Sequence, residues 1–186
     1  MTMTQAETVP GYVAGTWTID PMHSEVGFSV RHMMVSKVRG RFTKFSGQIV
    51  TGEDLPSSSV TAEIDLSSID TAAEQRDAHL RSPDFFDTDN HPLMTYRSTG
   101  IREKGDGYVV DGELTLKGVT RSVPLTLEVN GFGPDPYGGT RAGFTARAEI
   151  NRQDFGVNWN AAMETGGVVV SDKVAIQLEI EAVLQS

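Results

Sequence analysis

Apolar and polar residues alternate along most of this chain of 186 residues. A period of two is typical of β-strands that bury one face and expose the other. Since antiparallel sheets tolerate one wet face, we expect an all-β, antiparallel protein. The positions that carry the pattern are Val26, Phe28, Val30 and His32; Val60, Ala62, Ile64 and Leu66; Val110, Gly112, Leu114 and Leu116; Val123, Leu125, Leu127 and Val129; Ala142, Phe144, Ala146, Ala148 and Ile150; and Val174, Ile176, Leu178, Ile180, Ala182 and Leu184.

Two further runs, 16–20 and 38–49, complete a set of about eight strand candidates. In the second run the apolar parity slips between Phe42 and Phe45, which predicts a bulge. Turn-forming residues separate the runs, and no repeat or linker interrupts them. We therefore predict a single domain over residues 15–186, preceded by a flexible tail over residues 1–14.

One segment, residues 72–81, has the character of a helix. Thr71 and Glu74 match the T-x-x-E pattern of a capping box, and Asp77 and Arg81 have the spacing of an ion pair on one helix face. A Ser-Pro pair follows and ends the helix. We expect this segment to act as a short lid, in which Leu80 on the helix and Phe85 and Phe86 directly after it cover the end of the fold.

A set of about eight half-buried strands can form a packed sandwich or a closed barrel. The last strand, predicted over 173–183, would give a barrel about 28 Å tall if it is tilted by about 40°. Small residues on the inward face leave volume inside such a barrel. The pattern alone leaves two alternatives open: an apolar ligand tunnel, or an interior filled by loops and by Phe85 and Phe86. The small inward residues are Gly112, Ala142, Ala146 and Ala148.

The net charge of −9 argues against a nucleic-acid partner and against electrostatic docking on anionic lipid. The absence of cysteine excludes disulfides and thiolate chemistry. The N-terminal residues have no signal-peptide pattern, and no run approaches the roughly 20 apolar residues of a membrane span. We expect a cytoplasmic protein without stable membrane insertion.

Six blocks of the chain carry a resemblance to a known family, in the same order and with the same spacing. They are WTIDPMHSEVGFSVRHM (17–33), VRGRFTKFSGQI (38–49), SSIDTAAEQRDAHLRSPDFFD (67–87), GELTLKGVTRSVPLTL (112–127), INRQDFGVNWN (150–160) and VSDKVAIQLEIEA (170–182). The chain resembles the YceI-like family of polyisoprenoid-binding proteins. It departs from many relatives in lacking a signal peptide, and in having His91 before Pro92 where an aromatic residue is common.

This resemblance implies an eight-stranded antiparallel, extended lipocalin-like β-barrel with its helical segment near one end. It also implies that the interior holds a long apolar amphiphile, such as a polyisoprenoid or an isoprenoid quinone, without any cofactor or covalent step. The residues expected to line the tunnel are Trp17, Phe28, Val30, His32, Phe42, Leu80, Phe85, Phe86, Leu114, Leu116, Leu125, Leu127, Phe144, Trp159, Ile176 and Leu178. The candidates for contact with a polar head group are His32, Arg152, Asn158 and Asn160.

The histidines offer no clear catalytic or metal site. His79 and Asp77 are two residues apart on a helix and point to different sides, and no nucleophile motif accompanies them. The positions of His23 and His32 differ by nine, an odd number, so on a regular strand the two side chains would face opposite sides. We therefore expect no metal. His23 next to Asp20 fits a turn at the start of a strand.

A carrier or sequestering protein for an apolar small molecule is therefore the main hypothesis. An enzyme that acts on a lipid-like substrate through His32 or His23 is the alternative, and a scaffold with a filled barrel is a third. The sequence leaves a homodimer open.

Overall fold

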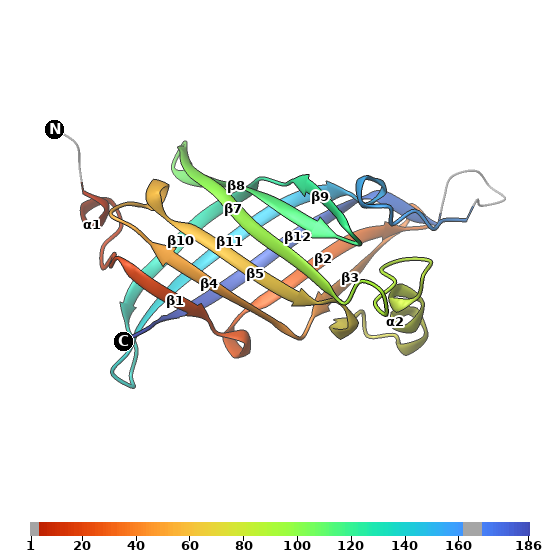
Figure 1. Cartoon of the computed structure of the whole chain (residues 1–186), viewed down its shortest axis with the longest axis horizontal. Helices are drawn as coiled ribbons and strands as arrows, with labels where there is room; N and C mark the ends of the chain where they lie inside the picture. Colours follow the sequence, from red (N-terminus) through yellow and green to blue (C-terminus); the bar gives the residue numbers. More distant parts are fainter. Residues whose placement is uncertain (1–3, 162–168) are drawn as a thin grey trace.

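The computed structural model of the protein describes residues 4–161 and 169–186. One antiparallel sheet closes into an elongated barrel with α1 and the C-terminus at one end and α2 at the other (Figure 1). The strands are β1 (Gly15–Ile19), β2 (Glu25–His32), β3 (Ser36–Phe42), β4 (Phe45–Thr51), β5 (Ser59–Asp65), β6 (Ile69–Asp70), β7 (Leu93–Lys104), β8 (Gly107–Leu116), β9 (Val119–Ser122), β10 (Leu125–Pro134), β11 (Thr140–Asn151) and β12 (Val170–Leu184). The helices are α1 (Gln5–Thr8) and α2 (Glu74–Arg81), with short 3-10 turns at Pro21–His23, Leu55–Ser57, Leu66–Ser68 and Arg152–Phe155.

Closure of the barrel depends on β12, which is 15 residues long and pairs with three strands. One edge of β12 pairs with β11, and the other pairs with β2 and then, near the C-terminus, with β1. β1 and β2 therefore act as two halves of one barrel strand, and β4 and β3 continue the sheet beside them. The result is an eight-stranded closed antiparallel barrel, which confirms the predicted fold class.

The irregularity predicted between Phe42 and Phe45 is a break between β3 and β4. Thr43 and Lys44 lie outside both strands, and their backbone amides donate to Ser68 instead of to a neighbouring strand. Both phenylalanine rings face the interior, although their positions differ by three, an odd number. The break therefore restores the inward parity that an unbroken strand would lose.

The break between β1 and β2 is fastened by Arg141 on β11. The Arg141 guanidinium donates to Asp20 at 2.9 Å, to Asp135 at 3.1 Å and to Glu181 at 2.7 Å. The Asp20 side chain also accepts from the backbone amide of Met22 and bonds His23 at 2.8 Å. These contacts hold the Pro21–His23 turn against β11 and β12, and they lower the pKa of Asp20 to about 2, chiefly through the bond from Arg141.

The helix α2 begins at Glu74, two residues later than predicted, and the capping box does not form. Ala72 has a positive φ of 63°, Ala73 is the N-cap, and no side chain caps the helix. The Thr71 amide and hydroxyl instead donate to the buried Asp77 carboxylate. The predicted ion pair of Asp77 with Arg81 is wrong for the same reason, since Arg81 pairs with Glu74 at 3.4 Å. Neither α-helix in the described part of the chain is long and apolar enough to cross a membrane.

Asp20→Asn is expected to lower the free energy of unfolding at pH 7 by about 1–2 kcal/mol. Because the folded-state pKa of about 2 lies below the ordinary value of 3.8, the stabilisation is complete above that ordinary value and disappears as the pH falls toward 2. Urea denaturation of both proteins between pH 2 and 7 measures this difference. Asp106→Asn, in the turn between β7 and β8, is the matched control; equal curves for Asp20→Asn and the control at pH 7 would contradict the assignment.

Candidate functional site

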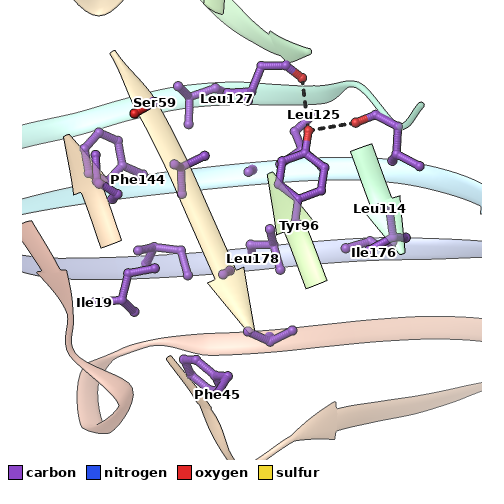
Figure 2. A pocket seen from close by; sticks show the side chains of 18 of the residues that line it. Ile19, Phe45, Ser59, Tyr96, Leu114, Leu125, Leu127, Phe144, Ile176 and Leu178 are labelled. Carbon is purple, nitrogen blue, oxygen red and sulfur yellow. Dashed lines mark hydrogen bonds between the residues drawn. The ribbon is translucent and has the colours of Figure 1, made fainter. Parts of the chain in front are cut away.

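The barrel encloses a cavity of about 160 Å³ near its middle. Figure 2 shows side chains from strands on all sides of the barrel converging on it, among them Ile19, Phe45, Phe144 and Leu178. Among the described residues that line the cavity, none is Asp, Glu, Lys, Arg or His. The wall comprises Ile19, Val26, Phe45, Ser46, Ile49, Leu55, Ser58, Ser59, Val60, Ala62, Ile64, Met94, Tyr96, Ile101, Val110, Leu114, Val123, Leu125, Leu127, Phe144, Ala146, Ile176, Leu178 and Ile180.

Among the described residues of the cavity wall, Tyr96 on β7 carries the aromatic hydroxyl. The hydroxyl donates to the carbonyl oxygen of Val123 at 2.8 Å (Figure 2), and burial raises the pKa of the phenol above its ordinary value. The ring lies over Gly112, where an added Cβ would come within 2.4 Å of the Tyr96 oxygen. The sequence analysis assigned empty volume to Gly112, and that expectation is wrong because the Tyr96 ring occupies the space.

Aromatic side chains close the α1 end of the barrel. Trp17 is 1% exposed, and its indole nitrogen donates to the Thr51 hydroxyl at 2.9 Å. Phe132 packs edge-on against Trp17 and Phe144, at ring-centroid distances of 5.3 and 5.9 Å. Tyr12 covers Phe132 from outside, with centroids 5.3 Å apart. Trp17 therefore belongs to the closed end of the barrel and not to the cavity wall.

The N-terminal segment, residues 4–14, lies against this same end. Gln5 is buried; its amide nitrogen donates to the Tyr108 hydroxyl at 3.2 Å, and its amide oxygen accepts from the Leu55 backbone at 2.8 Å. The Tyr12 hydroxyl donates to the Gly52 carbonyl at 2.9 Å. Leu55 lines the cavity. The structure thus gives residues 4–14 a defined position, whereas the sequence analysis treated residues 1–14 as a tail.

A second aromatic group closes the α2 end. Phe85 and Trp159 pack at 5.4 Å, and the His79 ring contacts both at about 5 Å. The helix expected from the sequence is therefore present at this end, and α2 and the residues after it lie beside the barrel there (Figure 1). Rings of β2 and β3 continue the group inward: Phe28 packs on Phe42, and Phe42 on Phe86.

Six of the residues predicted to line a tunnel lie on the cavity wall: Leu114, Leu125, Leu127, Phe144, Ile176 and Leu178. The other ten lie elsewhere, because alternation predicts which face a residue occupies but not its depth along the barrel axis. Those ten are Trp17, Phe28, Val30, His32, Phe42, Leu80, Phe85, Phe86, Leu116 and Trp159. Contact of any of the sixteen with a ligand stays a prediction.

Arg152 and Asn160 hold the backbone together and are not free for a head group. Arg152 is 4% exposed, and its guanidinium donates to four backbone carbonyls, including those of Val157 and Trp159 at 2.8 Å. Both polar atoms of the Asn160 amide bond the backbone of Val170. Both side chains instead join the segment that follows β11 to the start of β12, which gives them a structural role that the sequence analysis did not assign.

The remaining head-group candidates lie away from the cavity. Asn158 is exposed, and His32 lies at the last position of β2, opposite Ser36. His32 is not among the described residues that line the cavity. The enzyme hypothesis needed an interior histidine, and none of the described residues on the cavity wall is a histidine.

Several other titratable groups form hydrogen bonds and ion pairs away from the cavity. His79 bonds Asp84 at 2.8 Å, while Asp77 bonds Thr71, so these side chains point apart as expected. Asp20, His23 and Glu181 bring ligand atoms close enough to hold a metal ion. The Arg141 guanidinium already bonds both carboxylates there, which supplies the positive charge that a metal would bring.

Several wall residues escaped the sequence analysis although their positions were readable. Six of them belong to the alternating runs, but alternation does not tell which inward positions lie at the depth of the cavity. They are Val60, Ala62, Ile64, Val110, Ala146 and Ile180. Met94, Tyr96 and Ile101 on β7 were missed entirely. Their apolar spacing is interrupted by a register shift between Ser98 and Gly100, which hides the period of two.

Comparison with known proteins gives one consistent result. The family model described as YceI-like domain matches residues 17–182. A UPF0312 protein of Staphylococcus epidermidis is 40% identical over 168 residues, which cover 89% of this chain and 95% of the relative. Crystallised BcnA of Burkholderia cenocepacia aligns with a TM-score of 0.76 at 26% identity, over 88% of this chain and 98% of BcnA. A polyisoprenoid binding domain from Saccharophagus degradans shares the fold, with a TM-score of 0.68 at 17% identity over 93% of this chain and all of that domain (100%).

Gln5→Ala is expected to release the N-terminal segment from the α1 end, because it leaves the buried Leu55 amide and Tyr108 hydroxyl without their partner. The loss is about 1–2 kcal/mol of local stability. Hydrogen exchange of the amides of Thr8, Val9 and Tyr12 measures it. Val13→Ala, which shortens an exposed side chain on the same segment, is the control. Unchanged exchange in Gln5→Ala would show that Gln5 does not hold the segment.

Proposed function

Because the chain belongs to the YceI-like family, we propose that it binds the apolar part of an amphiphile inside its barrel. The apolar cavity, whose described wall has no charged side chain, is the observation that carries this proposal. An apolar cavity of this size loses little by accepting an apolar group, whereas a charged group would be desolvated without a partner. The fold shared with a polyisoprenoid binding domain supports an isoprenoid chain as the ligand.

The size of the cavity constrains how such a chain binds. A closed apolar cavity of about 150 Å³ holds a molecule the size of benzene. The volume of about 160 Å³ found here therefore accommodates a short part of an isoprenoid tail. We infer that a longer tail displaces the side chains that close one end of the barrel.

The α2 end is the better candidate for this displacement. Trp17 at the opposite end is fixed by a hydrogen bond to Thr51, and Gln5 is bonded on both sides of its amide. Phe85 and Phe86 are held at the α2 end by packing, with hydrogen bonds only from their backbone. Their side chains can move without breaking a polar contact.

The binding energy comes from apolar burial, at about 0.8 kcal/mol for each methylene removed from water. A bilayer offers a tail nearly the same gain, so selectivity depends on fit to the wall. The Tyr96 hydroxyl donates its hydrogen bond to the Val123 carbonyl, and none of the described residues of the wall is Asp, Glu, Lys, Arg or His. This supports carriage or sequestration in preference to a reaction.

Ala146→Leu is expected to weaken binding of an isoprenoid ligand by at least about tenfold, because the added methyl groups fill the cavity that the tail needs. Ala146 is buried on the cavity wall of β11. Ala175→Leu adds the same group on the exposed face of β12 and is the matched control. Native mass spectrometry of freshly purified protein, followed by organic extraction and by titration with a short isoprenoid alcohol, measures occupancy, ligand mass and affinity.

A protein that purifies empty and binds neither the alcohol nor a hydrophobic dye would contradict the proposal and support a filled scaffold. Equal affinities of the Ala146→Leu and Ala175→Leu variants would show that the ligand binds outside this cavity.

A further inference from the structure

The hairpin between β2 and β3 presents apolar side chains to solvent at its tip. Met33, Met34 and Val35 are consecutive, and their exposed fractions are 41%, 58% and 84%. Figure 1 shows β2 and β3 running to the barrel end that carries α2. Exposed apolar residues are ordinary when scattered, but three in a row at the tip of a hairpin form a protruding apolar surface.

The backbone fixes this tip in its exposed position. Met33 and Met34 have positive φ angles of 54° and 64°, and the Val35 amide donates to the His32 carbonyl. The Met33 amide donates to Val169 at 2.7 Å, which ties the tip to the start of β12. A left-handed conformation is unfavourable for methionine, so the chain accepts some strain to form this turn.

The hairpin is basic, although the whole chain has a net charge of −9. No Asp or Glu occurs between Val26 and Gly52, while five cationic residues do: Arg31, Lys37, Arg39, Arg41 and Lys44. All five are exposed. The acidic residues lie on the other elements, including α2 and the segment after it at the same end of the barrel, so the positive charge is concentrated in this hairpin.

Three of the cations near the tip lack an ion-pair partner within the described structure, as does Lys44 just beyond β3. Arg31 and Lys37 lie directly opposite each other across the hairpin, and like charges in that position are destabilising. Neither they nor Arg39 forms an ion pair with any residue in 4–161 or 169–186, whereas Arg41 pairs with Asp70 at 3.6 Å. The nearby Asp172 is occupied by Gln153 and Arg152. The arrangement leaves positive charge beside the apolar tip.

We propose that this hairpin docks the protein on an anionic phospholipid bilayer, with Met34 and Val35 in the apolar boundary and the cations at the phosphates. Apolar side chains flanked by unpaired Lys and Arg match the interface of a membrane, where burial and electrostatic attraction add together. The described acidic residues are repelled by the same surface, so contact with the bilayer is confined to the hairpin. The net charge alone argued against such docking; the distribution of charge reverses that conclusion for this hairpin.

Vesicle sedimentation tests the proposal, using phosphatidylcholine vesicles with and without about one third phosphatidylglycerol. We expect binding to the anionic vesicles only, and loss of binding in high salt. Lys37→Glu is expected to weaken binding by at least about fivefold, the value of one cation near an anionic surface. Met34→Ser with Val35→Ser is expected to weaken it by about tenfold.

Matched controls lie far from the tip. Lys104→Glu, in the hairpin of β7 and β8, makes the same change in net charge as Lys37→Glu. Met22→Ser with Tyr137→Ser removes two apolar side chains that are 90% and 89% exposed elsewhere. We expect both controls to bind like the unaltered protein, and thermal unfolding verifies that all variants are folded.

Equal binding to neutral and anionic vesicles, no binding to either, or equal loss in the tip variants and their controls would overturn the proposal. A dimer that dissociates in the Met34→Ser, Val35→Ser variant would also overturn it, by assigning the tip to a second copy of the chain. Because the vesicles carry no isoprenoid, failure here is distinguishable from failure of ligand binding in the cavity.

Discussion

The pairing of β12 with three strands is the constraint on which the rest of the structure depends. A sheet that ended at β11 would leave two edges with unpaired amides and carbonyls, and β1 and β2 would have no common neighbour. Because β12 spans both, the sheet closes, and every inward side chain must share one interior. The apolar cavity, the aromatic groups at the two ends and the outward charges all follow from that closure.

The alternation of residues was sufficient to predict the antiparallel barrel, because the period of two reports directly which face of a strand is buried. It could not separate wall from barrel end: Leu114 and Leu116 are both inward and buried, yet only Leu114 reaches the cavity. Position along the axis depends on strand register, which is set by pairings distant in sequence. The start of α2 was misplaced for a similar reason, since the Thr71 side chain bonds Asp77 instead of capping the helix.

Charged residues were the hardest to place from sequence. Arg152 has the composition of a ligand-binding group, but its guanidinium bonds four carbonyls within the protein. Five hydrogen donors in a fixed fork suit that structural role as well as they suit a ligand. The average charge was equally uninformative, because a net value of −9 conceals a hairpin without acidic residues. Both cases show that a charge acquires meaning from its neighbours, and neighbours come from the fold.

The contact between Tyr96 and Gly112 has a consequence for how barrels of this kind can diverge. The phenol ring occupies the space where any Cβ at position 112 would lie, so a larger residue there and a tyrosine at position 96 exclude each other. The carbonyl oxygen of Arg97 would lie 2.8 Å from the same Cβ, so glycine is required at position 112 whatever residue occupies position 96. Divergence at this place therefore falls to position 96 alone. A shorter side chain there would open a lateral chamber beside the cavity, while Gly112 keeps the close approach of β7 and β8.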